Sequence, residues 1–548
     1  MNWLTKLRLF VHILTWRFTW SRHKLDYKPS KTRSPKFVSA WDAAGKIGDG
    51  ACVFSNGFAG NARCSIFFYA IRDRFIRTGH PKGLTWINNG AQGSRGKVPG
   101  TVEELGIPGL MKRYLAGHLE TCKAQLRLAE RGELELHTLP QGAISLLLEA
   151  QTRGEQHLRS KTGVGSFLDP RTGTGSVIHP PGAESFVEAD GDALIYTMPQ
   201  PDVALFNAPY ADAEGNIYFK HAATLTENRF SAAAARQKGG LVMAAVSGII
   251  PRSDAEISMP ASEVDYIVVN PYNEQTVSVP QHRYWPMFTP ACALDTRAAV
   301  QRLKFINTFL KITPVRDEIG QRMARLAADT FVKEVPKGSM INIGVGFPEE
   351  AVRVLIERGL EETYTFTTEA GSYGGLPAPG IFFGAAIHPQ HLESSQDMFH
   401  RYQTELEAAM FGFLHVDRQG NVNVSKRGPR LTDYVGPGGL PDIAEGARTL
   451  IFVGNWMHGA EYRLEGETIR LIKPGKPKFV DQVPEVTFNG QVGLAAGKKI
   501  FYVTEVGLFQ LTPEGLTLRE VSPGIDVERD ILAYFRPGGV GAFRRLGG

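Results

Sequence analysis

Short apolar runs that end in glycines, each followed by a stretch of helical periodicity, recur along the chain from residue 36 onward. One lies in DGACVFSNGFAG at residues 49–60, and another lies in KGSMINIGVGFP at residues 337–348. Both patterns predict a turn, a buried strand and then glycines before a helix. Strands that alternate with helices favour parallel or mixed sheets covered on both faces. We therefore expect an α/β fold.

A second pair of similar segments follows the first. DAEGNI at residues 212–217 and DRQGNV at residues 417–422 share an Asp, a Gly-Asn pair and a β-branched residue at the same spacing, which is typical of a hairpin turn. An apolar strand follows in each case, beginning at Leu241 and at Leu450. The repeated order predicts two related open α/β domains, a duplicated fold with mixed or parallel sheets.

The spacing of these segments shows that the two halves differ in length. Gly50 and Gly215 are 165 residues apart, whereas Gly338 and Gly420 are only 82 residues apart. The first half must therefore carry additional elements, which we expect within residues 85–190.

The join between the halves is expected at residues 286–318, where prolines bracket a mixed helical stretch, and a helix over 316–334 begins the second half. Single hydrophobic cores stop growing near ~250–300 residues, so a chain of 548 residues requires two domains. We assign an N-terminal domain to residues 36–300 and a C-terminal domain to residues 315–537.

Residues 1–35 precede both domains as a basic extension. Lys6, Arg8 and Arg17 interrupt its apolar run before that run reaches the ~18 residues that a membrane span needs. The apolar residues recur at helical spacing, and they are Trp3, Leu7, Phe10, Val11, Leu14 and Phe18.

Three interpretations of residues 1–35 are open: a helix that contacts a membrane surface, an organelle presequence, or an upstream segment with no part in the fold. Under the third, deletion of residues 1–35 leaves thermal stability and turnover nearly unchanged. We expect a cytoplasmic protein, or one of an organelle matrix if the extension is a presequence.

The charge of the chain is concentrated at its N-terminal end. Residues 1–36 hold nine basic side chains and one acid, a net charge of +8. Subtracting +8 from the total of +5 leaves −3 on the other 512 residues, so the body of the protein is not expected to bind nucleic acid. Cys52, Cys64, Cys122 and Cys292 are too few and too scattered for a disulfide framework or a C-x-x-C zinc site, which indicates a reducing compartment.

The segment with the richest chemistry is centred on Glu369. A β-rich run from Tyr364 ends at this carboxylate, and the chain then turns through glycines and prolines as far as Gly380. The carboxyl ends of strands face the ligand crevice in open α/β sheets, so Glu369 is expected where catalytic groups are mounted. From its position alone, Glu369 could equally cap a turn or form a surface ion pair.

Several motifs around and beyond Glu369 resemble those of the family I coenzyme A (CoA) transferases. Among these enzymes the chain is most similar to the fused-subunit type, which acts as acetate or propionate CoA-transferase and handles 3-oxoacids. The resemblance runs from about residue 36 to residue 537. The matching motifs are GAQG (90–93), GLMKRYLAGH (109–118), KTGVGSFLDP (161–170), TEAGSYGGLP (368–377), FGAA (383–386), DRQGNVNVS (417–425), GPGG (436–439), YVTE (502–505) and PGIDVERDIL (523–532).

The resemblance implies a covalent mechanism with Glu369 as the nucleophile. Its carboxylate attacks an acyl-CoA to form an acyl-glutamyl anhydride, the CoA thiolate returns to form glutamyl-CoA, and a second acid reverses these steps. No cofactor is expected to be bound permanently, because CoA is both substrate and covalent partner. No metal site is expected, since the sequence holds no ligand cluster with productive spacing.

The resemblance also implies the residues that assist Glu369. The side-chain amide of Gln92 and the backbone amides of Gly438 and Gly439 are the candidates to stabilise an oxyanion. Gln92 could instead bond only to its own glycine-rich loop, and the glycine pair could simply form a turn. The active-site loop with Gly371, Gly374 and Gly375 is expected to keep water from the intermediate.

The expected partners are an acyl-CoA, small carboxylic acids and further copies of the chain in a homo-oligomer. The metabolic context implied by the resemblance is that of short-chain fatty acids and ketone bodies. The sequence leaves the acyl chain length and the acceptor acid open.

Three functions compete with the transferase. Gly344 and Gly346 imitate a dinucleotide-binding fingerprint, but Glu349 stands where that motif needs a small residue. A hydrolase of CoA thioesters or cyclic diketones on the same scaffold is also open, and so is a non-catalytic CoA-binding protein. His118 and His458 are interpreted as structural, since the mechanism needs no general base.

Overall fold

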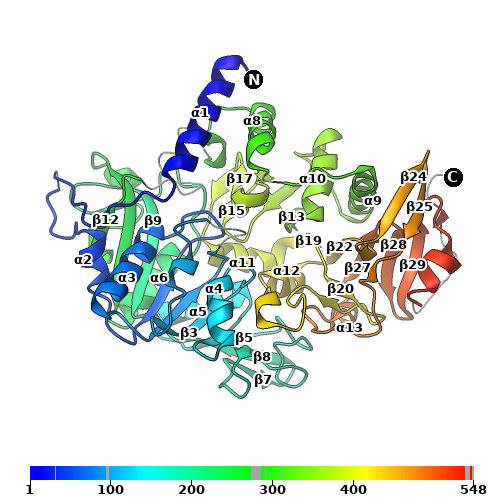
Figure 1. The fold of residues 1–548 in the computed structure, drawn as a ribbon, viewed down its shortest axis with the longest axis horizontal. Helices are drawn as coiled ribbons and strands as arrows, with labels where there is room; N and C mark the ends of the chain where they lie inside the picture. The colour runs from blue at the N-terminus through cyan, green and yellow to red at the C-terminus, as the bar shows by residue number, and fades with distance from the viewer. Residues whose placement is uncertain are drawn as a thin grey trace.

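The structure is a computed structural model that describes residues 1–30, 32–93, 98–272, 285–290, 292–311, 313–536 and 544–545. Two α/β halves lie side by side, the first coloured blue to green and the second yellow-green to red in Figure 1. Lys31, counted among the basic residues of the extension, and Pro537, the expected end of the second domain, lie outside the described residues.

The first half is built on a nine-stranded sheet in which the neighbours from β12 to β4 run parallel, while β6 and β10 are antiparallel to their partners. Every residue of β1 and β2 is buried, as a strand covered on both faces requires. Across the sheet the strands are β12 (Tyr266–Val269), β11 (Leu241–Ile249), β9 (Val203–Ala211), β1 (Cys52–Ser55), β2 (Leu84–Asn88), β3 (Met111–Ala116), β4 (Glu135–His137) and β6 (Val177–His179), with β10 (Ile217–Tyr218) paired to β9.

The second half is built on a ten-stranded sheet. Strands β14, β13, β19, β22 and β27 form a parallel centre. At one edge β15 and β18 pair antiparallel, at the other β28 is antiparallel to β27 and to β29, and β30 pairs parallel with β29. Across the sheet the strands are β18 (His391–Leu392), β15 (Ser372–Tyr373), β14 (Thr365–Thr367), β13 (Met340–Ile343), β19 (Leu406–Phe411), β22 (Thr449–Val453), β27 (Lys499–Thr504), β28 (Gly507–Thr512), β29 (Gly515–Val521) and β30 (Arg544–Arg545). The expected α/β class with mixed, mostly parallel sheets is confirmed.

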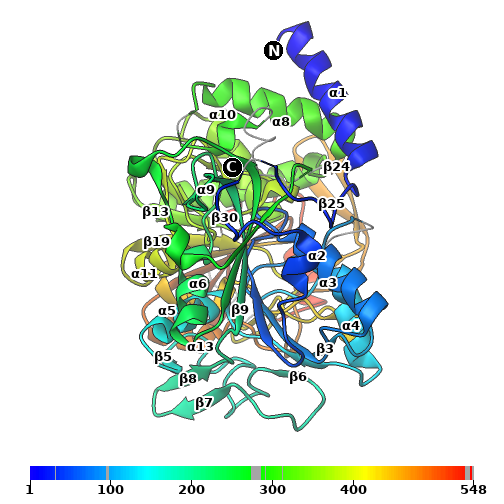
Figure 2. The ribbon, with the colours of Figure 1, turned by 90° about the vertical axis from the view of Figure 1, so that its left-hand side faces the viewer.

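Helices cover both faces of each sheet, as Figures 1 and 2 show. In β22, Ile451 and Val453 pack in the cluster that contains the apolar side of α9, whereas Leu450 and Phe452 pack in the one that contains residues of α11 and α12. Successive strand residues point to opposite faces, so one short strand contributes to two cores. The helices are α1 (Trp3–Thr19), α2 (Ala40–Ala44), α3 (Ser65–Thr78), α4 (Lys123–Glu130), α5 (Gln141–Thr152), α6 (Asn228–Gln237), α8 (Thr296–Leu310), α9 (Glu318–Glu334), α10 (Phe347–Glu357), α11 (Ser395–Glu405), α12 (Leu440–Gly446) and α13 (Gly490–Ala495).

The two Asp-x-x-Gly-Asn segments form hairpin turns, as predicted. Asp212 Oδ1 accepts from the backbone amides of Glu214, Gly215 and Asn216 at 2.9–3.1 Å, and the turn joins β9 to β10. Asp417 acts in the same way between β20 (His415–Val416) and β21 (Val422–Asn423). These local hydrogen bonds explain why the motif could be identified from sequence alone.

The additional elements of the first half include a three-stranded ribbon. It is formed by β5 (His157–Ser160), β8 (Ala193–Thr197) and β7 (Val187–Asp190), and it projects from the lower edge in Figures 1 and 2. The remaining two-stranded pairs are β16 (Leu376–Pro377) with β17 (Ala386–Ile387), β23 (Met457–His458) with β26 (Lys476–Pro477), and β24 (Glu461–Glu465) with β25 (Thr468–Lys473).

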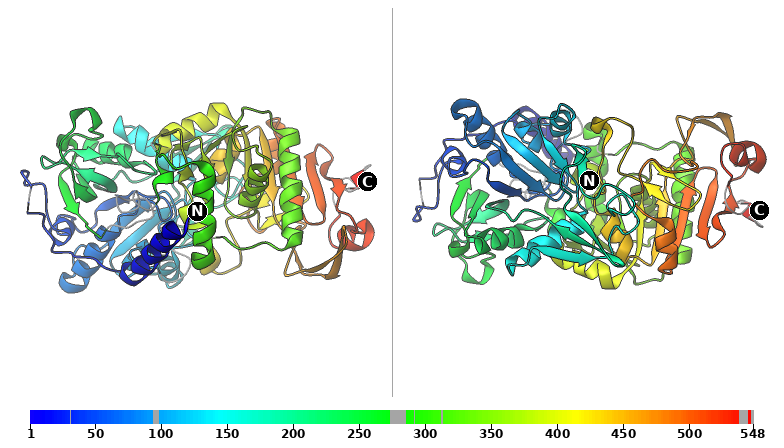
Figure 3. Two further views of the ribbon diagram at one scale, coloured as in Figure 1. Left: turned by 90° about the horizontal axis from the view of Figure 1, so that it is seen from above. Right: turned by 90° about the horizontal axis from the view of Figure 1, so that it is seen from below.

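The N-terminal extension packs on the body of the protein. Leu9 and Ile13 of α1 are buried in the same cluster as Trp285 and Ile306, and the ring of Phe10 lies 5.2 Å from that of Phe309 on α8. Figure 1 shows α1 and α8 together at the top of the molecule, and Figure 3 shows them from above, towards the middle of its length. The interpretation of residues 1–35 as a segment with no part in the fold is therefore wrong.

Candidate active site

Glu369 lies just beyond the carboxyl end of β14, next to the parallel strand β13. Its side chain is only 7% exposed. In the register of the two strands Asn342 pairs with Thr367, and the Asn342 amide donates to Glu369 Oε2 over 3.3 Å. The same amide donates to the hydroxyl of Tyr402 on α11 over 3.0 Å. Glu369 is thus a buried acid and not a surface ion-pair partner.

Burial sets the protonation behaviour of Glu369. Loss of water raises the pKa of its carboxyl above 4.5, whereas hydrogen bonds from its own backbone amide and from Asn342 act to lower that pKa. No positive charge is among the causes of this shift. A carboxylate that is desolvated in this way is a stronger nucleophile once ionised, because little water must be removed before it reacts.

The glycines after Glu369 are required by the path of the chain. Gly371, Gly374 and Gly375 have φ angles of 102°, 74° and 75°, in the left-handed region that favours glycine. A methyl group on Gly371 would lie 2.0 Å from the carbonyl oxygen of Glu393, and one on Gly375 would lie 2.2 Å from that of Ile387. The loop folds back tightly over the end of β14, and its role in excluding water stays a prediction.

Gly439 is the nearer of the two candidate backbone donors to Glu369. A methyl group on its α-carbon would lie 3.8 Å from Glu369 Oε1 and 3.1 Å from Gln141 Oε1. Gly439 is the N-cap of α12, and within the part of the chain that the structure describes its amide has no hydrogen-bond acceptor. The Gly438 amide, by contrast, donates to the carbonyl oxygen of Gly117 over 2.8 Å.

Gln92 is buried in the first half, where its side chain already has partners. Its Nε2 donates to the carbonyl oxygens of Ser55 over 2.7 Å and Gly57 over 3.2 Å, and its Oε1 accepts from the Ser55 hydroxyl over 2.7 Å. In this geometry both amide hydrogens are used, and their acceptors lie at the end of β1 and in the loop after it, not in Gln92's own glycine-rich loop. An oxyanion role for Gln92 stays a prediction that requires the side chain to turn.

The two halves meet around Glu369. The backbone amide of Thr226 donates to the carbonyl oxygen of Ala370, the residue after Glu369, over 3.3 Å. Asn61 of the first half donates to the carbonyl oxygen of Phe383 over 2.6 Å. The catalytic candidate thus comes from the second half, while part of its enclosure comes from the first.

The position of α12 is fixed by contacts with α5 of the first half. The backbone amide of Gln141 donates to the carbonyl oxygen of Gly438 over 3.1 Å, and the backbone amide of Gly142 donates to Asp442 Oδ2 over 2.7 Å. Burial raises the pKa of Asp442 to about 7, and the hydrogen bonds from Gly142 and Ala143 oppose this rise.

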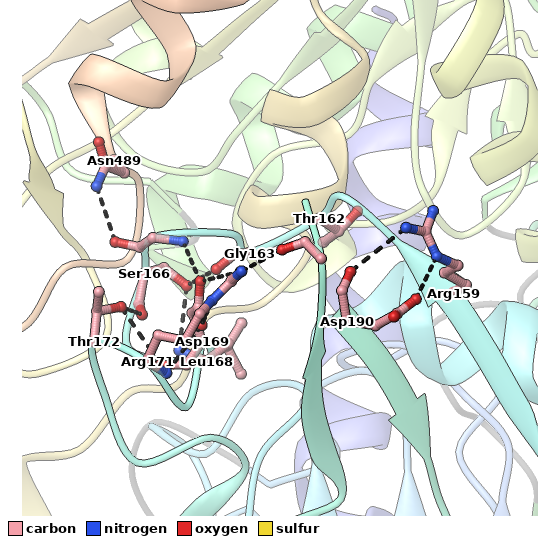
Figure 4. A network of polar contacts seen from close by, with 12 residues as sticks. Arg159, Thr162, Gly163, Ser166, Leu168, Asp169, Arg171, Thr172, Asp190 and Asn489 are labelled. Atoms are coloured by element: carbon pink, nitrogen blue, oxygen red, sulfur yellow. Dashed lines mark hydrogen bonds and ion pairs between the residues drawn. The ribbon is translucent and has the colours of Figure 1, made fainter. Parts of the chain in front are cut away.

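The KTGVGSFLDP motif forms a second link between the halves (Figure 4). The side-chain amide of Asn489, the N-cap of α13, donates to the carbonyl oxygen of Gly165 over 2.9 Å. The backbone amide of Phe167 donates to the carbonyl oxygen of Val486 over 2.8 Å. Asp169 is buried, and both of its carboxylate oxygens accept from the Arg171 guanidinium at 2.7 Å. Because these bonds and those from backbone amides outweigh the effect of burial, the pKa of Asp169 is lowered. The motif thus helps to hold the two halves together.

Sequence reasoning missed Asn342, Tyr402 and Gln141. Asn342 carried a signal, because it is a polar residue within the otherwise apolar strand Met340–Ile343. A buried amide in such a strand needs a hydrogen-bond partner, and here one partner is Glu369. Tyr402 and Gln141 carried none, since their contacts join residues far apart in sequence.

The dinucleotide-like segment has a structural explanation. Glu349 at the third position of α10 accepts from the Gly346 amide over 3.0 Å through Oε2 and from the Gly380 amide over 3.2 Å through Oε1. Its carboxylate thus lies over the helix N-terminus that would have to receive a pyrophosphate. A dinucleotide site is excluded here by this capping contact.

The cysteines, a metal site and a membrane span were the other features considered in the sequence. Cys52, Cys64 and Cys122 are buried, and burial raises the pKa of the Cys52 thiol to about 12. Across the described ranges no three His, Cys, Asp or Glu side chains are grouped so that they could hold a metal ion. Among the described helices, none combines the length and hydropathy needed to cross a membrane.

Comparison with known proteins places the chain among the CoA transferases. Residues 37–270 match the family model described as Coenzyme A transferase. The chain is 31% identical over 517 residues to the caffeate CoA-transferase of Acetobacterium woodii, with 91% of this chain and 93% of the relative covered. It is 28% identical to the acetate CoA-transferase YdiF of Escherichia coli K12, with 90% and 91% covered.

Solved structures agree with this assignment. The acyl-CoA transferase YdiF of Escherichia coli O157:H7 matches at 25% identity, covering 95% of this chain and 97% of that one. The TM-score is 0.79 for its apoenzyme and 0.80 for its thioester complex with CoA.

Proposed function

The chain belongs to family I of the coenzyme A transferases, as a single-chain enzyme of the fused-subunit type, and on that premise we propose that it moves CoA from a short-chain acyl-CoA to a free carboxylate through a glutamyl-CoA thioester on Glu369. The observation that carries the proposal is the burial of this carboxylate at the end of β14, beside Gly439, whose amide has no acceptor among the described residues. The YdiF structure described as a thioester complex with CoA supports a covalent route on this fold.

The first half-reaction exchanges one activated acyl group for another. A Glu369 oxygen attacks the donor carbonyl carbon, the C–S bond breaks, and CoA leaves as its thiolate from an acyl-glutamyl anhydride. The thiolate then attacks the glutamyl carbonyl carbon, which releases the donor acid as a carboxylate and leaves glutamyl-CoA. An acceptor carboxylate repeats the steps in reverse, so no net proton or water is consumed.

The surrounding residues have separate tasks in this scheme. The Gly439 amide is our candidate donor to the oxyanion that forms in each attack, and removal of such a donor typically lowers kcat by ~10²–10³-fold. Asn342 orients Glu369 through its 3.3 Å hydrogen bond. The loop with Gly371, Gly374 and Gly375 closes the end of β14 and keeps water from the thioester.

The test is to look for the intermediate directly. Incubation with acetyl-CoA and no acceptor acid should add the mass of CoA, less one water, to the peptide that contains Glu369, and borohydride should then reduce the thioester to an alcohol. Glu369→Gln, which keeps the side-chain volume, should fold with an unchanged circular dichroism spectrum, form no adduct and lose transfer.

Kinetics distinguish transfer from hydrolysis. A ping-pong reaction gives parallel double-reciprocal lines, since the first acid leaves before the second binds. Steady release of CoA without an acceptor would identify a hydrolase on this fold. Retention of more than a few per cent of kcat by Glu369→Gln would reject Glu369 as the nucleophile.

A further inference from the structure

Apolar side chains lie on two opposite faces of α1. Leu9 and Ile13 are 3% and 6% exposed and pack in the core of the body, and the His12 ring lies 6.3 Å from that of Trp285. With 3.6 residues per turn, a second set of apolar residues lies on the far side of the helix. It comprises Trp3, Leu4, Leu7, Val11, Leu14 and Phe18, all of them exposed.

The outer face is extensive and lies on the side of α1 opposite Leu9 and Ile13, and one of its edges, at Leu7 and Val11, borders a cavity between α1 and the body. Trp3 is 74% and Phe18 is 81% exposed, although both are large hydrophobic residues. At 1.5 Å per residue, the 17 residues of α1 extend over about 26 Å. A contiguous row of this length marks an interaction site and not scattered surface residues.

Positive charges border this face, and the sequence of α1 supplies no negative ones. On a helical wheel Lys6 and Arg17 lie roughly a quarter turn to one side of the apolar row, and Arg8 lies roughly a quarter turn to the other. The first acidic residue in the chain is Asp26, so α1 contains no acid at all.

The neighbouring helix α8 continues the same surface. Phe309 of α8 is 45% exposed and lies beside Phe10 of α1. Arg297, Lys304 and Lys311 are exposed, and residues 296–311 contain no Asp or Glu. Figures 1 and 2 show α1 and α8 at the same end of the molecule, where α1 extends beyond the body.

We propose that the outer face of α1, together with the Phe309 end of α8, docks on an anionic membrane surface. An in-plane amphipathic helix inserts its apolar row between the lipid headgroups, while the flanking cations contact lipid phosphates. Lys6, Arg8 and Arg17 interrupt the apolar run along the sequence, so the helix is expected to lie in the plane of the interface and not to cross the membrane. Leu9, His12 and Ile13 stay buried, so docking holds the enzyme at the surface without unfolding it.

The charges around the outer face of α1 favour a lipid surface over a second copy of the chain as its partner. The spacing of Leu4, Leu7, Val11, Leu14 and Phe18 would also suit a helix pair. Two α1 helices packed face to face, however, would bring their cations together with no acid in either helix to pair with them. An anionic membrane satisfies both the apolar row and its basic borders.

The experiment uses the full-length protein and vesicles. Phosphatidylcholine vesicles are compared with vesicles in which about a third of the lipid is phosphatidylglycerol. The wild-type protein should co-sediment with the anionic vesicles, and binding should weaken as salt is added. The double variant Trp3→Ser/Phe18→Ser should bind at least tenfold more weakly, with unchanged thermal stability and transferase activity, because both side chains are largely exposed and neither belongs to the active site.

A control variant removes two exposed apolar side chains elsewhere on the surface. Ile76→Ser/Ile472→Ser alters residues that are 65% and 45% exposed on α3 and β25, and it should bind vesicles like the wild type. Lys6→Gln/Arg17→Gln should weaken anionic binding and flatten its salt dependence.

Three results would overturn the proposal. The wild type could fail to bind anionic vesicles, or it could bind phosphatidylcholine equally well. Light scattering could also show a dimer that only the Trp3→Ser/Phe18→Ser variant loses, which would assign the face to a second copy. Because activity in solution is measured separately, failure here leaves the transferase proposal intact.

Discussion

Two adjacent glycines, Gly438 and Gly439, should respond in opposite ways to the same added methyl group. Gly439 has a φ of −86°, which alanine adopts freely, but its methyl group would enter the space 3.8 Å from Glu369 Oε1. Gly438 has a φ of 61°, which alanine adopts only with strain, but nothing lies within 4 Å of its methyl group. We therefore expect Gly439→Ala to impair catalysis and Gly438→Ala to impair stability.

The expected magnitudes follow from this geometry. At Gly439 the methyl group would lie 3.8 Å from Glu369 Oε1 and would displace Gln141 Oε1, which it would meet at 3.1 Å, so it fills the space beside the carboxylate. A partial loss of oxyanion stabilisation, about 1.4–2.7 kcal/mol, lowers kcat by about ten- to a hundredfold. At Gly438 the left-handed conformation costs about 1–2 kcal/mol of folding free energy.

The assay measures both quantities on both variants. Initial rates with acetyl-CoA and a carboxylate acceptor give kcat and kcat/KM, and thermal unfolding gives the change in stability. Gly439→Ala should unfold within a few degrees of the wild type, since an alanine at a compatible φ stabilises by about 0.4–1 kcal/mol and offsets the close contact. Gly438→Ala should unfold at lower temperature and keep most of kcat.

An exchange of the two phenotypes would contradict the roles assigned to Gly438 and Gly439. Loss of catalysis in a fully stable Gly438→Ala would assign the oxyanion donor to the amide now paired with Gly117. Wild-type kcat in Gly439→Ala would remove Gly439 from the reaction.

Two further predictions concern stability. Burial raises the pKa of Asp442 from 3.8 to about 7, so the contribution of this carboxyl to stability is fully present below pH ~3.8 and is lost as the pH rises through about 7, by at most about 1.4 kcal/mol per pH unit. Asp442→Asn should therefore gain stability relative to the wild type between pH 5 and pH 8 in paired unfolding curves. A difference in unfolding free energy between the two proteins that stays constant over this pH range would contradict the shift. Ile13→Ala should destabilise the protein by roughly 2 kcal/mol or more and speed proteolysis between residues 20 and 36, because Ile13 is buried against the body. Leu14→Ala, on the exposed side of α1, should change stability by less than about 0.5 kcal/mol. Equal effects of the two substitutions would show that α1 is not docked on the body.

Sequence reasoning identified the elements whose causes are local. The Asp212 and Asp417 turns could be predicted because each carboxylate bonds to backbone amides within four residues. The strand that precedes Glu369 could be predicted from its β-rich composition. Both elements depend on interactions between residues that are close in sequence, so a single sequence is enough to predict them.

The contacts that define the site could not be predicted in this way. Gly438 and Gly117 are far apart in the chain, yet their hydrogen bond decides which of the two adjacent glycine amides is already paired. Gln92 is similar, because its two acceptors come from another part of the chain: Ser55 is the last residue of β1, and Gly57 lies in the loop after it. A glycine pair or a buried amide limits the possible donors, and only tertiary structure selects among them.

Helix α1 shows how periodicity can mislead. The apolar row read from the sequence, which includes Trp3, Leu7 and Phe18, is the exposed side, and the buried side is formed by Leu9 and Ile13. A helix that is apolar on two sides has two candidate core faces. Periodicity could predict the helix but not the side that packs on the body.

The location of Glu369 explains why both halves belong to one enzyme. Its strand, β14, lies in the second half, but Thr226 of the first half bonds to Ala370, and Gln141 of the first half holds the Gly438 carbonyl. The pKa shift of Glu369 arises from burial, and residues of both halves surround it. Separation of the halves would return water to the carboxylate, lower its pKa towards 4.5 and expose any thioester to hydrolysis. Joining the halves in one chain keeps that enclosure independent of protein concentration.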